Sequence, residues 1–234
     1  MNMELDFIKD MFDSIAPKYD FLNRFLSFRQ DVVWRRQMVK AAAIPDGGEV
    51  LDVACGTCDV ALEIKKQKGS RATVSGTDFS PGMLFLGKEK ILSHCCGTMD
   101  IGLAAGNALA LPFKDNCFDA LFVAFGIRNI MDREGALVDF YRTLKKNGKV
   151  VILELSAPRQ GGFQRLYMTY FQKILPLIGG IFSKNKNAYH YLPASVLKFP
   201  GAPSFASTME KAGFNDIQWK KMTLGIVTLF VGTK

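Results

Sequence analysis

The polar residues best placed for chemistry follow runs of apolar residues that are typical of buried strands. In a parallel sheet the carboxyl ends of the strands meet at one edge, and ligands bind there. Side chains directly after such strands are therefore expected to line one ligand site. Asp52 lies near the end of the first of these strands with Gly56 in the turn that follows, and Asp78 and Asn107 follow the next two.

The turn after the first predicted strand limits which nucleotide can bind. A dinucleotide fingerprint needs three glycines, and this turn has only Gly56. S-adenosylmethionine (SAM) has no phosphates. It needs a close approach of the backbone, which Gly56 permits, and a carboxylate near its amino acid part, which Asp52 supplies. The turn therefore favours SAM over NAD. An ordinary strand-to-helix turn capped by Asp59 is the alternative interpretation.

Asp78 strengthens the nucleoside interpretation. It lies about twenty residues beyond Gly56, where an acidic side chain can accept hydrogen bonds from both ribose hydroxyls. The alternative is that Asp78 caps the helix expected to begin near Ser80 and Pro81. Asn107 follows the next strand and can bond the adenine edge.

Short strand-like runs alternate with helical patterns in the middle of the chain, which predicts a doubly wound parallel sheet. The expected strands are residues 50–54, 72–77, 101–104, 120–125 and 150–155, and the expected helices are 59–68, 81–93 and 133–146, the last stopped by Asn147-Gly148. A helix at 204–211 and strands at 216–222 and 226–231 follow. A C-terminal antiparallel hairpin on a mostly parallel sheet is typical of the class I SAM-dependent methyltransferase (Rossmann-like) fold.

We therefore expect a single methyltransferase domain over residues 1–234. Its parts are a helical N-terminal segment at 1–44, a SAM-binding core at 45–155, a basic aromatic cap at 156–203, and a closing helix and strands at 204–234. The composition agrees with a globular chain, because 48% of the residues are hydrophobic and 22% are charged.

Other signals exclude several protein classes. No run of 18 apolar residues occurs, so no membrane span is predicted. The N-terminus lacks an apolar signal region, so a cytoplasmic location is expected. The five cysteines are a poor disulfide framework, and Cys55-x-x-Cys58 lacks the setting of a redox pair. Neither His94 nor His190 completes a zinc spacing, so no metal is expected.

The cap segment carries much of the net charge of +8. No acidic residue lies between Glu154 and Glu210, and cations alternate with aromatic residues from Phe163 to Phe205. This composition suits peripheral contact with an anionic membrane surface, or coverage of an apolar ligand. Packing on the core with the cations in water is the alternative. No nucleic acid partner is expected, and a homo-oligomer is left open.

With these motifs in place, the chain resembles the ubiquinone/menaquinone biosynthesis C-methyltransferase family over nearly its whole length. The matching segments are 12–20 with Asn23 and 26–28, 51–54 with Gly56, Thr57 and Asp59, 107–108 with 111–113, 125–129, and 189–192 with Ser195. Two departures stand out, since the family usually has glycine in place of Cys58 and serine in place of Ala124. We expect the first to alter the loop geometry or donor affinity and the second to remove a hydroxyl contact.

The resemblance implies that Thr57, Asp78, Asn107 and Ala108 contact SAM, with Gly56 forming the floor of the loop. It also implies methylation of a ring carbon of a prenylated hydroquinone, either demethylmenaquinol or the equivalent ubiquinone precursor. The sequence does not determine which ring is used.

Such a reaction requires an electron-rich ring carbon, which ionisation of a ring hydroxyl provides. The pKa of a phenol is near 10, so a fixed guanidinium beside the oxygen would stabilise the phenolate. We assign this role to Arg128, with Asn129 orienting the oxygen or a water. Candidates for proton acceptance or hydroxyl contact are Tyr19, Asp20 and Asn23 in the N-terminal segment and His190 and Tyr191 in the cap.

Other interpretations stay open at this point. Arg128 could instead cap a helix or pair with Asp132. The charge would suit an RNA- or protein-directed methyltransferase, although residues 124–127 lack the Asn-Pro-Pro-aromatic motif of amino-group enzymes. The acceptor could also be another small molecule. Finally, Cys58 could have abolished SAM binding, which would leave a non-catalytic binding protein.

Overall fold

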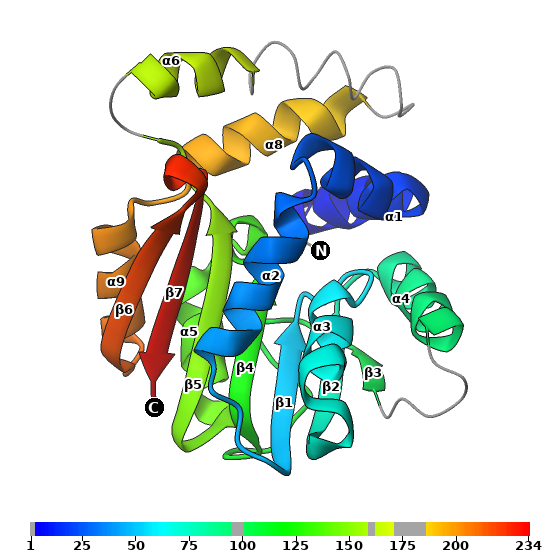
Figure 1. The fold of residues 1–234 in the computed structure, drawn as a ribbon, viewed down its shortest axis with the longest axis vertical. Helices are drawn as coiled ribbons and strands as arrows, with labels where there is room; N and C mark the ends of the chain where they lie inside the picture. Colours follow the sequence, from blue (N-terminus) through cyan, green and yellow to red (C-terminus); the bar gives the residue numbers. More distant parts are fainter. Residues whose placement is uncertain (1–2, 95–100, 159–161, 171–185) are drawn as a thin grey trace.

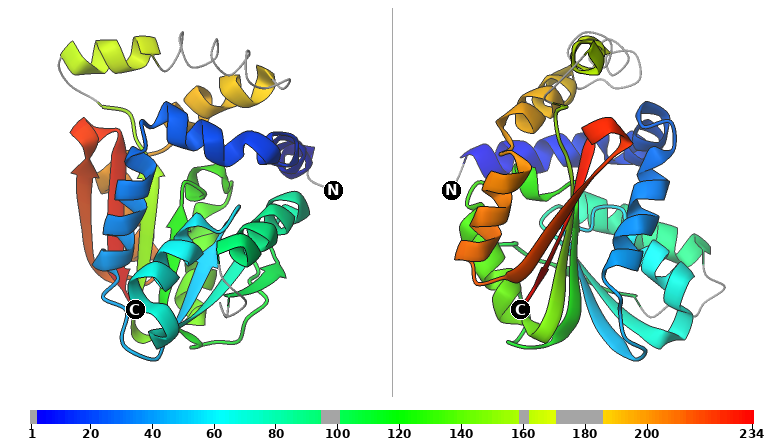
Figure 2. Two further views of the ribbon diagram at one scale, coloured as in Figure 1. Left: turned by 45° about the vertical axis from the view of Figure 1, so that its right-hand side comes forward. Right: turned by 60° about the vertical axis from the view of Figure 1, so that its left-hand side comes forward.

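The computed structural model describes residues 3–94, 101–158, 162–170 and 186–234. Helices pack on both faces of a single twisted sheet, and a further group of helices lies across one end of it (Figures 1 and 2). That end carries the residues that the sequence singled out.

Seven strands form the sheet in the order β3-β2-β1-β4-β5-β7-β6. The strands β1 to β5 pair in parallel, and β7 is antiparallel to both β5 and β6. The predicted mostly parallel sheet with an antiparallel C-terminal hairpin is confirmed. The strands are β1 (Gly48–Val53), β2 (Ala72–Asp78), β3 (Ile101–Ala105), β4 (Phe118–Ala124), β5 (Leu144–Leu155), β6 (Asn215–Met222) and β7 (Val227–Thr233).

Helices cover both faces of this sheet, and they are α2 (Gln30–Ala41), α3 (Asp59–Lys68), α4 (Pro81–His94), α5 (Arg133–Thr143) and α9 (Ala202–Lys211). On one face, α2 and α3 pack in a core that includes Met38, Ile64 and Val50 of β1. On the other face, α5 and α9 pack in a core that includes Phe205 and Leu51 of β1. Neighbouring residues of β1 therefore enter different cores, and both faces of the strand are covered.

A third group of helices covers the carboxyl end of the sheet (Figure 2). These helices are α1 (Met3–Leu26), α6 (Gly162–Thr169) and α8 (Lys186–Lys198), with the short 3-10 helices η2 (Ile127–Asn129) and η4 (Thr223–Gly225). The 3-10 helix η1 (Gly69–Arg71) lies at the opposite end, directly before β2. Within the described ranges, no helix has the length and hydropathy needed to cross a bilayer. Segments from distant parts of the chain therefore meet over one edge of the sheet.

One helix is shorter than its pattern predicts. The helix α5 ends at Thr143 rather than at 146, and Leu144 begins β5, where it pairs with Phe118. Leu144 is fully buried there, which stabilises the extended backbone. Asn147 therefore lies inside β5, with a left-handed φ of 66°, instead of ending a helix. The other predicted elements of the sheet and its covering helices agree to within a few residues.

Cys58 has the strained backbone that its replacement of a glycine predicts. It precedes α3 with a φ of 66°, in the left-handed region that L residues rarely adopt. Its thiol is completely buried. A Cβ at Gly87 of α4 would lie 2.5 Å from the Cys58 Sγ and 3.2 Å from the Gly56 carbonyl oxygen. The helix can therefore approach this turn only because Gly87 has no side chain.

We predict that Gly87→Ala lowers the free energy of unfolding by about 1–3 kcal/mol, because the new methyl group overpacks against the thiol. In a Cys58→Gly background the same substitution should cost at least about 1 kcal/mol less. Urea unfolding of the wild type, both single variants and the double variant measures this coupling. An equal cost in both backgrounds would show that the thiol does not set the spacing.

Candidate functional site

Two buried carboxylates lie at the carboxyl ends of neighbouring strands. Asp52 of β1 is 1% exposed, and its Oδ2 accepts a hydrogen bond from the Ala61 backbone N–H at 3.2 Å. Asp78 ends β2, and its oxygens accept from the backbone N–H groups of Gly56 and Ser80 at 2.8 and 2.9 Å. The contact with Ser80 is the local one that a capping role predicts. The contact with Gly56 ties the turn after β1 to β2.

Burial raises the pKa of both carboxyl groups. It raises the pKa of Asp52 to about 8, with Asp78 adding to the effect, while the Ala61 N–H and the charge of Arg35 oppose it. Burial also raises the pKa of Asp78, against its backbone hydrogen bonds. Buried carboxyl groups in such surroundings are stabilised by a proton or by a cation. The turn therefore suits a positively charged ligand.

Side chains from α1 and α2 occupy most of the space above this turn. The cavity that remains is about 30 Å³ and is lined by the turn itself, by Ala124, and by Tyr19 and Arg35. That volume is about the share of one water molecule in the liquid. A ligand of nucleoside size therefore enters only when Tyr19 and Arg35 move aside.

Charged side chains hold α1 over the turn. Thr57 Oγ1 donates to Asp20 of α1 at 2.6 Å, and Lys90 of α4 donates to Asp20 at 2.6 Å and to Asp59 at 2.5 Å. Arg24 of α1 donates to both oxygens of Asp59 at 2.9 and 3.0 Å. Although burial opposes the charged form, the surrounding cations hold the pKa of Asp59 well below its usual value. Asp20 is thus engaged in holding the turn, a placement that favours positioning over proton transfer.

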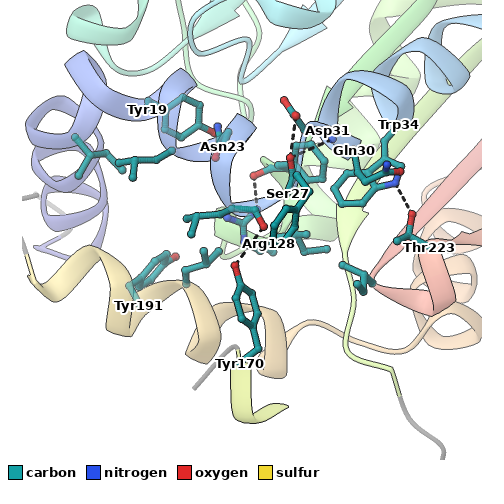
Figure 3. Close-up of a pocket in the computed structure, with 18 of the residues that line it drawn as sticks. Tyr19, Asn23, Ser27, Gln30, Asp31, Trp34, Arg128, Tyr170, Tyr191 and Thr223 are labelled. Atoms are coloured by element: carbon teal, nitrogen blue, oxygen red, sulfur yellow. Dashed lines mark hydrogen bonds between the residues drawn. The ribbon is translucent and has the colours of Figure 1, made fainter. Parts of the chain in front are cut away.

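A second and larger cavity lies beneath the cap helices (Figure 3). Its volume is about 560 Å³, within the range of small-molecule sites. Tyr19, Asn23 and Arg128 are among the polar side chains that reach it. Most of the wall is apolar and includes Phe12, Ile15, Leu22, Leu26, Trp34, Phe125, Leu155, Leu192 and Ile226.

Arg128 reaches this cavity from η2, directly after β4. Its Nη1 donates to Glu154 Oε1 at 2.8 Å and also to the Phe125 carbonyl. Its Nε donates to Ser195 Oγ at 3.3 Å, and its backbone N–H donates to Glu154 Oε2 at 3.1 Å. Within the described residues, no hydrogen bond of Arg128 uses Nη2. The guanidinium is therefore fixed on one side and keeps donors for a ligand on the other.

Glu154 is a residue of this site that the sequence reasoning missed. It lies on β5, is completely buried, and also accepts from the Leu155 backbone N–H at 2.8 Å. The alternative pairing of Arg128 with Asp132 is wrong, because Asp132 accepts from the Gly135 N–H at 2.8 Å and caps α5. A signal was available in the sequence, since Glu154 is the single charged residue among the apolar residues 150–155. A carboxylate in such a position needs a buried partner.

The cap helix α8 is bonded to the same turn. The Tyr191 hydroxyl donates to Asn129 Oδ1 at 3.1 Å, and Ser195 accepts from Arg128. Asn129 is not among the described residues that line the larger cavity. The structure therefore brings Arg128 to the cavity and leaves Asn129 in contact with the cap.

Two further candidates for proton acceptance have different outcomes. Tyr19 lines both cavities, and burial raises the pKa of its hydroxyl. It therefore stays protonated at neutral pH and can donate a hydrogen bond. The side chain of His190 lies outside the part of α8 whose side chains are described, so its role stays a prediction.

The last two candidates, Asn107 and Ala108, lie in the turn after β3. Asn107 is exposed, and its Oδ1 accepts from the Leu109 N–H at 3.0 Å. Ala108 packs against the core. The Gly106 N–H donates to the Asp78 carbonyl at 3.0 Å, which places this turn beside the carboxylate pair. Neither residue lines the two cavities described above.

Comparison with known proteins decides which family this geometry belongs to. The model of the ubiE/COQ5 methyltransferase family matches residues 1–234. The chain belongs to this family. The "Ubiquinone/menaquinone biosynthesis C-methyltransferase UbiE" of Geobacter sulfurreducens is 48% identical over 228 residues, which cover 97% of this chain and 88% of that protein. The "Demethylmenaquinone methyltransferase" of Thermus thermophilus is 42% identical over 224 residues, or 96% of this chain and 100% of that one.

Solved structures agree at the level of the fold. A SAM-dependent methyltransferase from Thermotoga maritima has a TM-score of 0.66 at 20% identity, with 96% of this chain and 99% of that chain covered. The putative methyltransferase in a complex from Haloferax volcanii has a TM-score of 0.69 at 14% identity, with 95% and 96% covered. The methyltransferase fold and the family resemblance expected from the sequence are both confirmed.

The Arg128–Glu154 pair gives a first prediction for this ubiE/COQ5 family member. Glu154→Gln should lower the free energy of unfolding by about 3 kcal/mol, because it leaves a buried guanidinium without its counter-charge. The double variant Arg128→Met/Glu154→Gln should recover much of that loss. Denaturant unfolding of Glu154→Gln, Arg128→Met, the double variant and the wild type checks this. If the double variant loses the sum of two independent costs, the pair is not coupled.

Asp52 gives a second prediction, on pH. Its pKa is about 8 in the folded protein and about 3.9 in an unfolded chain, so the folded state holds the proton more tightly. Its contribution to stability is full below pH 4 and is lost as the pH rises toward 8. Asp52→Asn keeps a neutral side chain, so relative to the wild type it should gain about 2–4 kcal/mol between pH 5 and pH 8. A wild-type-minus-variant difference that is the same at both pH values would contradict the assignment.

Proposed function

We propose that this chain transfers a methyl group from SAM to a ring carbon of a prenylated hydroquinone, either demethylmenaquinol or the equivalent ubiquinone precursor. Membership of the ubiE/COQ5 methyltransferase family supports C-methyltransferase activity. The structural observation that carries the choice of acceptor is an apolar cavity of about 560 Å³ with the fixed cation Arg128 in its wall. Such a space suits a hydrophobic ring that bears a hydroxyl group.

The turn between β1 and α3 is the proposed donor site. SAM supplies an already activated methyl group when it is bound. Asp52 would face the ammonium group and release its proton as the cation arrives, because a nearby positive charge favours the carboxylate. Gly56 has a φ of 53° and open space where a Cβ would stand, which lets a ligand approach the backbone. Thr57, Asp78, Asn107 and Ala108 are the other proposed donor contacts.

Arg128 is the proposed electrophilic group for the acceptor. A hydrogen bond donated by its guanidinium to the oxygen of a ring hydroxyl would lower the pKa of that hydroxyl from about 10. Ionisation of the hydroxyl would then raise the electron density on the ring. Glu154 and Ser195 fix the guanidinium, so it does not have to reorganise during the reaction. Asn129 would support Arg128 indirectly, through the hydrogen bond that it accepts from Tyr191 of α8.

The ring proton that leaves after methylation must be accepted at the same cavity. Tyr19 lines this space, and its raised pKa suits it to donate a hydrogen bond to a ring oxygen. Asp20 would affect the reaction indirectly, because its hydrogen bond with Thr57 holds the turn after β1 in place. His190 stays a candidate base because histidine is the residue type most often used as a general base.

The location of the acceptor adds a membrane surface to this proposal. A prenyl tail dissolves in a bilayer, so we place the enzyme in the cytoplasm, in peripheral contact with the anionic inner face of the membrane. Of the basic aromatic cap expected at 156–203, the structure describes residues 156–158, 162–170 and 186–203. A homo-oligomer is compatible with this arrangement.

A methyl-transfer assay with paired demethylated naphthoquinol and benzoquinol acceptors tests the function. We expect SAM-dependent methylation at a ring carbon, detected by mass spectrometry, with Arg128→Lys lowering kcat by about 10²-fold because the fixed geometry is lost. Titration with SAM by calorimetry serves as the control, since Arg128→Lys should bind the donor like the wild type. Absence of saturable SAM binding would favour a non-catalytic protein, and methylation of RNA alone would overturn the acceptor.

A further inference from the structure

The two most exposed large apolar side chains of the described residues lie on two different loops. Phe28 is 80% exposed in the connection between α1 and α2, and Leu224 is 74% exposed in η4, between β6 and β7. Isolated apolar residues on a surface are common and need no explanation. Here, however, both belong to short loops at the end of the sheet that carries the cap (Figures 1 and 2).

In both loops the backbone at the exposed side chain has an unfavourable conformation. Phe28 and its neighbour Arg29 have φ values of 51° and 62°, and Thr223 and Leu224 have values of 47° and 56°. The left-handed region is unfavourable for a bulky or β-branched residue, and glycine or asparagine would fit there more easily. Strain of this kind without a packing reward is a pointer to function. Burial of the Phe28 and Leu224 side chains does not offset this strain, because both are largely exposed.

The two loops flank the mouth of one cavity. Phe28 and Thr223 both line the space of about 560 Å³. The Trp34 Nε1 of α2 donates to Thr223 Oγ1 at 2.8 Å, which joins the start of α2 to η4 (Figure 3). Because Phe28 lines this space and is itself 80% exposed, the cavity reaches the surface beside the first loop.

The charge around the two side chains has one sign. Arg29 in the first loop, and Lys220 and Lys221 just before the second, are exposed cations. Residues 27–30 and 219–226 contain no aspartate or glutamate. The next acidic residue, Asp31, is buried and paired with Arg35 at 2.6 Å. Two exposed apolar side chains with cations around them are suited to a membrane. The apolar groups match its acyl chains, and the cations match its anionic headgroups.

We propose that residues 27–30 and 219–226 form a docking face for an anionic lipid bilayer, with Phe28 and Leu224 entering the acyl region beside the cavity mouth. The inference rests on the proposed function, because a membrane-dissolved acceptor would then pass from the bilayer into the cavity. It assigns the contact to two loops outside the basic aromatic cap. A lipid surface is favoured over a nucleic acid because the protruding groups are apolar and the cavity behind them is apolar.

Leu224→Asn and Phe28→Asn test the docking face. Asparagine tolerates the left-handed backbone, so the free energy of unfolding should stay the same or rise. Co-sedimentation with vesicles of phosphatidylglycerol and phosphatidylcholine, without donor or acceptor, should show a roughly tenfold weaker affinity for each variant. Arg29→Gln/Lys221→Gln should remove most of the preference for anionic over pure phosphatidylcholine vesicles.

Leu92→Asn on α4 is the matched control, because Leu92 is 64% exposed and lies outside the two loops. It should leave vesicle affinity unchanged. Wild-type affinity in Leu224→Asn and Phe28→Asn, an equal loss in Leu92→Asn, or no binding of the wild type to anionic vesicles would overturn the proposal. A change from dimer to monomer by analytical ultracentrifugation in the loop variants would also overturn it, in favour of self-association.

A separate assay distinguishes this proposal from the proposed function. Methyl transfer to a short-tailed, water-soluble acceptor should be unchanged in Leu224→Asn, since Leu224 does not line the cavity, and only transfer to a vesicle-embedded acceptor should weaken. Failure of the wild type to methylate the soluble acceptor would contradict the proposed function and leave the vesicle result standing.

Discussion

The buried ion pair between Arg128 and Glu154 is the contact on which the arrangement of the cavity depends. Removing two charges from water costs at least as much as their attraction returns, so stability alone does not account for the pair. Its geometry joins three parts of the fold, because Glu154 is on β5, Arg128 is in η2, and Ser195 on α8 accepts from the same guanidinium. The result is a cation that is fixed in the wall of an apolar space, where its field is screened much less than in water.

The N-terminal helix sets the relation between the two cavities. Tyr19 lines both of them, and its neighbour Asp20 bonds to Thr57 and Lys90. The turn after β1 is therefore closed while the apolar cavity is open. Hydrogen bonds and ion pairs close it, and the described apolar residues of α1 belong to neither of the two cores on the faces of the sheet.

Seven of the eleven non-glycine residues with a left-handed φ, counted over the described ranges, lie at the same end of the molecule. Ala54 after β1 and Phe125 after β4 have left-handed φ values of 52° and 59°, as does Cys58 at 66°. Phe28 and Leu224 add two more in the loops before α2 and β7. Each such residue costs of order 1 kcal/mol and persists only where the surrounding structure holds it in place. The cores on the two faces of the sheet provide that support, so the regular part of the fold stabilises the irregular part.

The sequence by itself determined the parallel sheet, its C-terminal hairpin and the family, because strand runs, helix patterns and the segments 12–20 and 125–129 are local signals. It also placed Asp52, Gly56 and Asp78 at one edge, since parallel strands end together. Only the tertiary structure decided that Glu154, rather than Asp132, pairs with Arg128, that Asp20 holds the turn, and that β5 begins at Leu144. These outcomes depend on contacts between residues far apart in the chain. The partner of a buried charge is the opposite charge that tertiary packing brings close to it, and the spacing of residues in the sequence does not reveal which one that is.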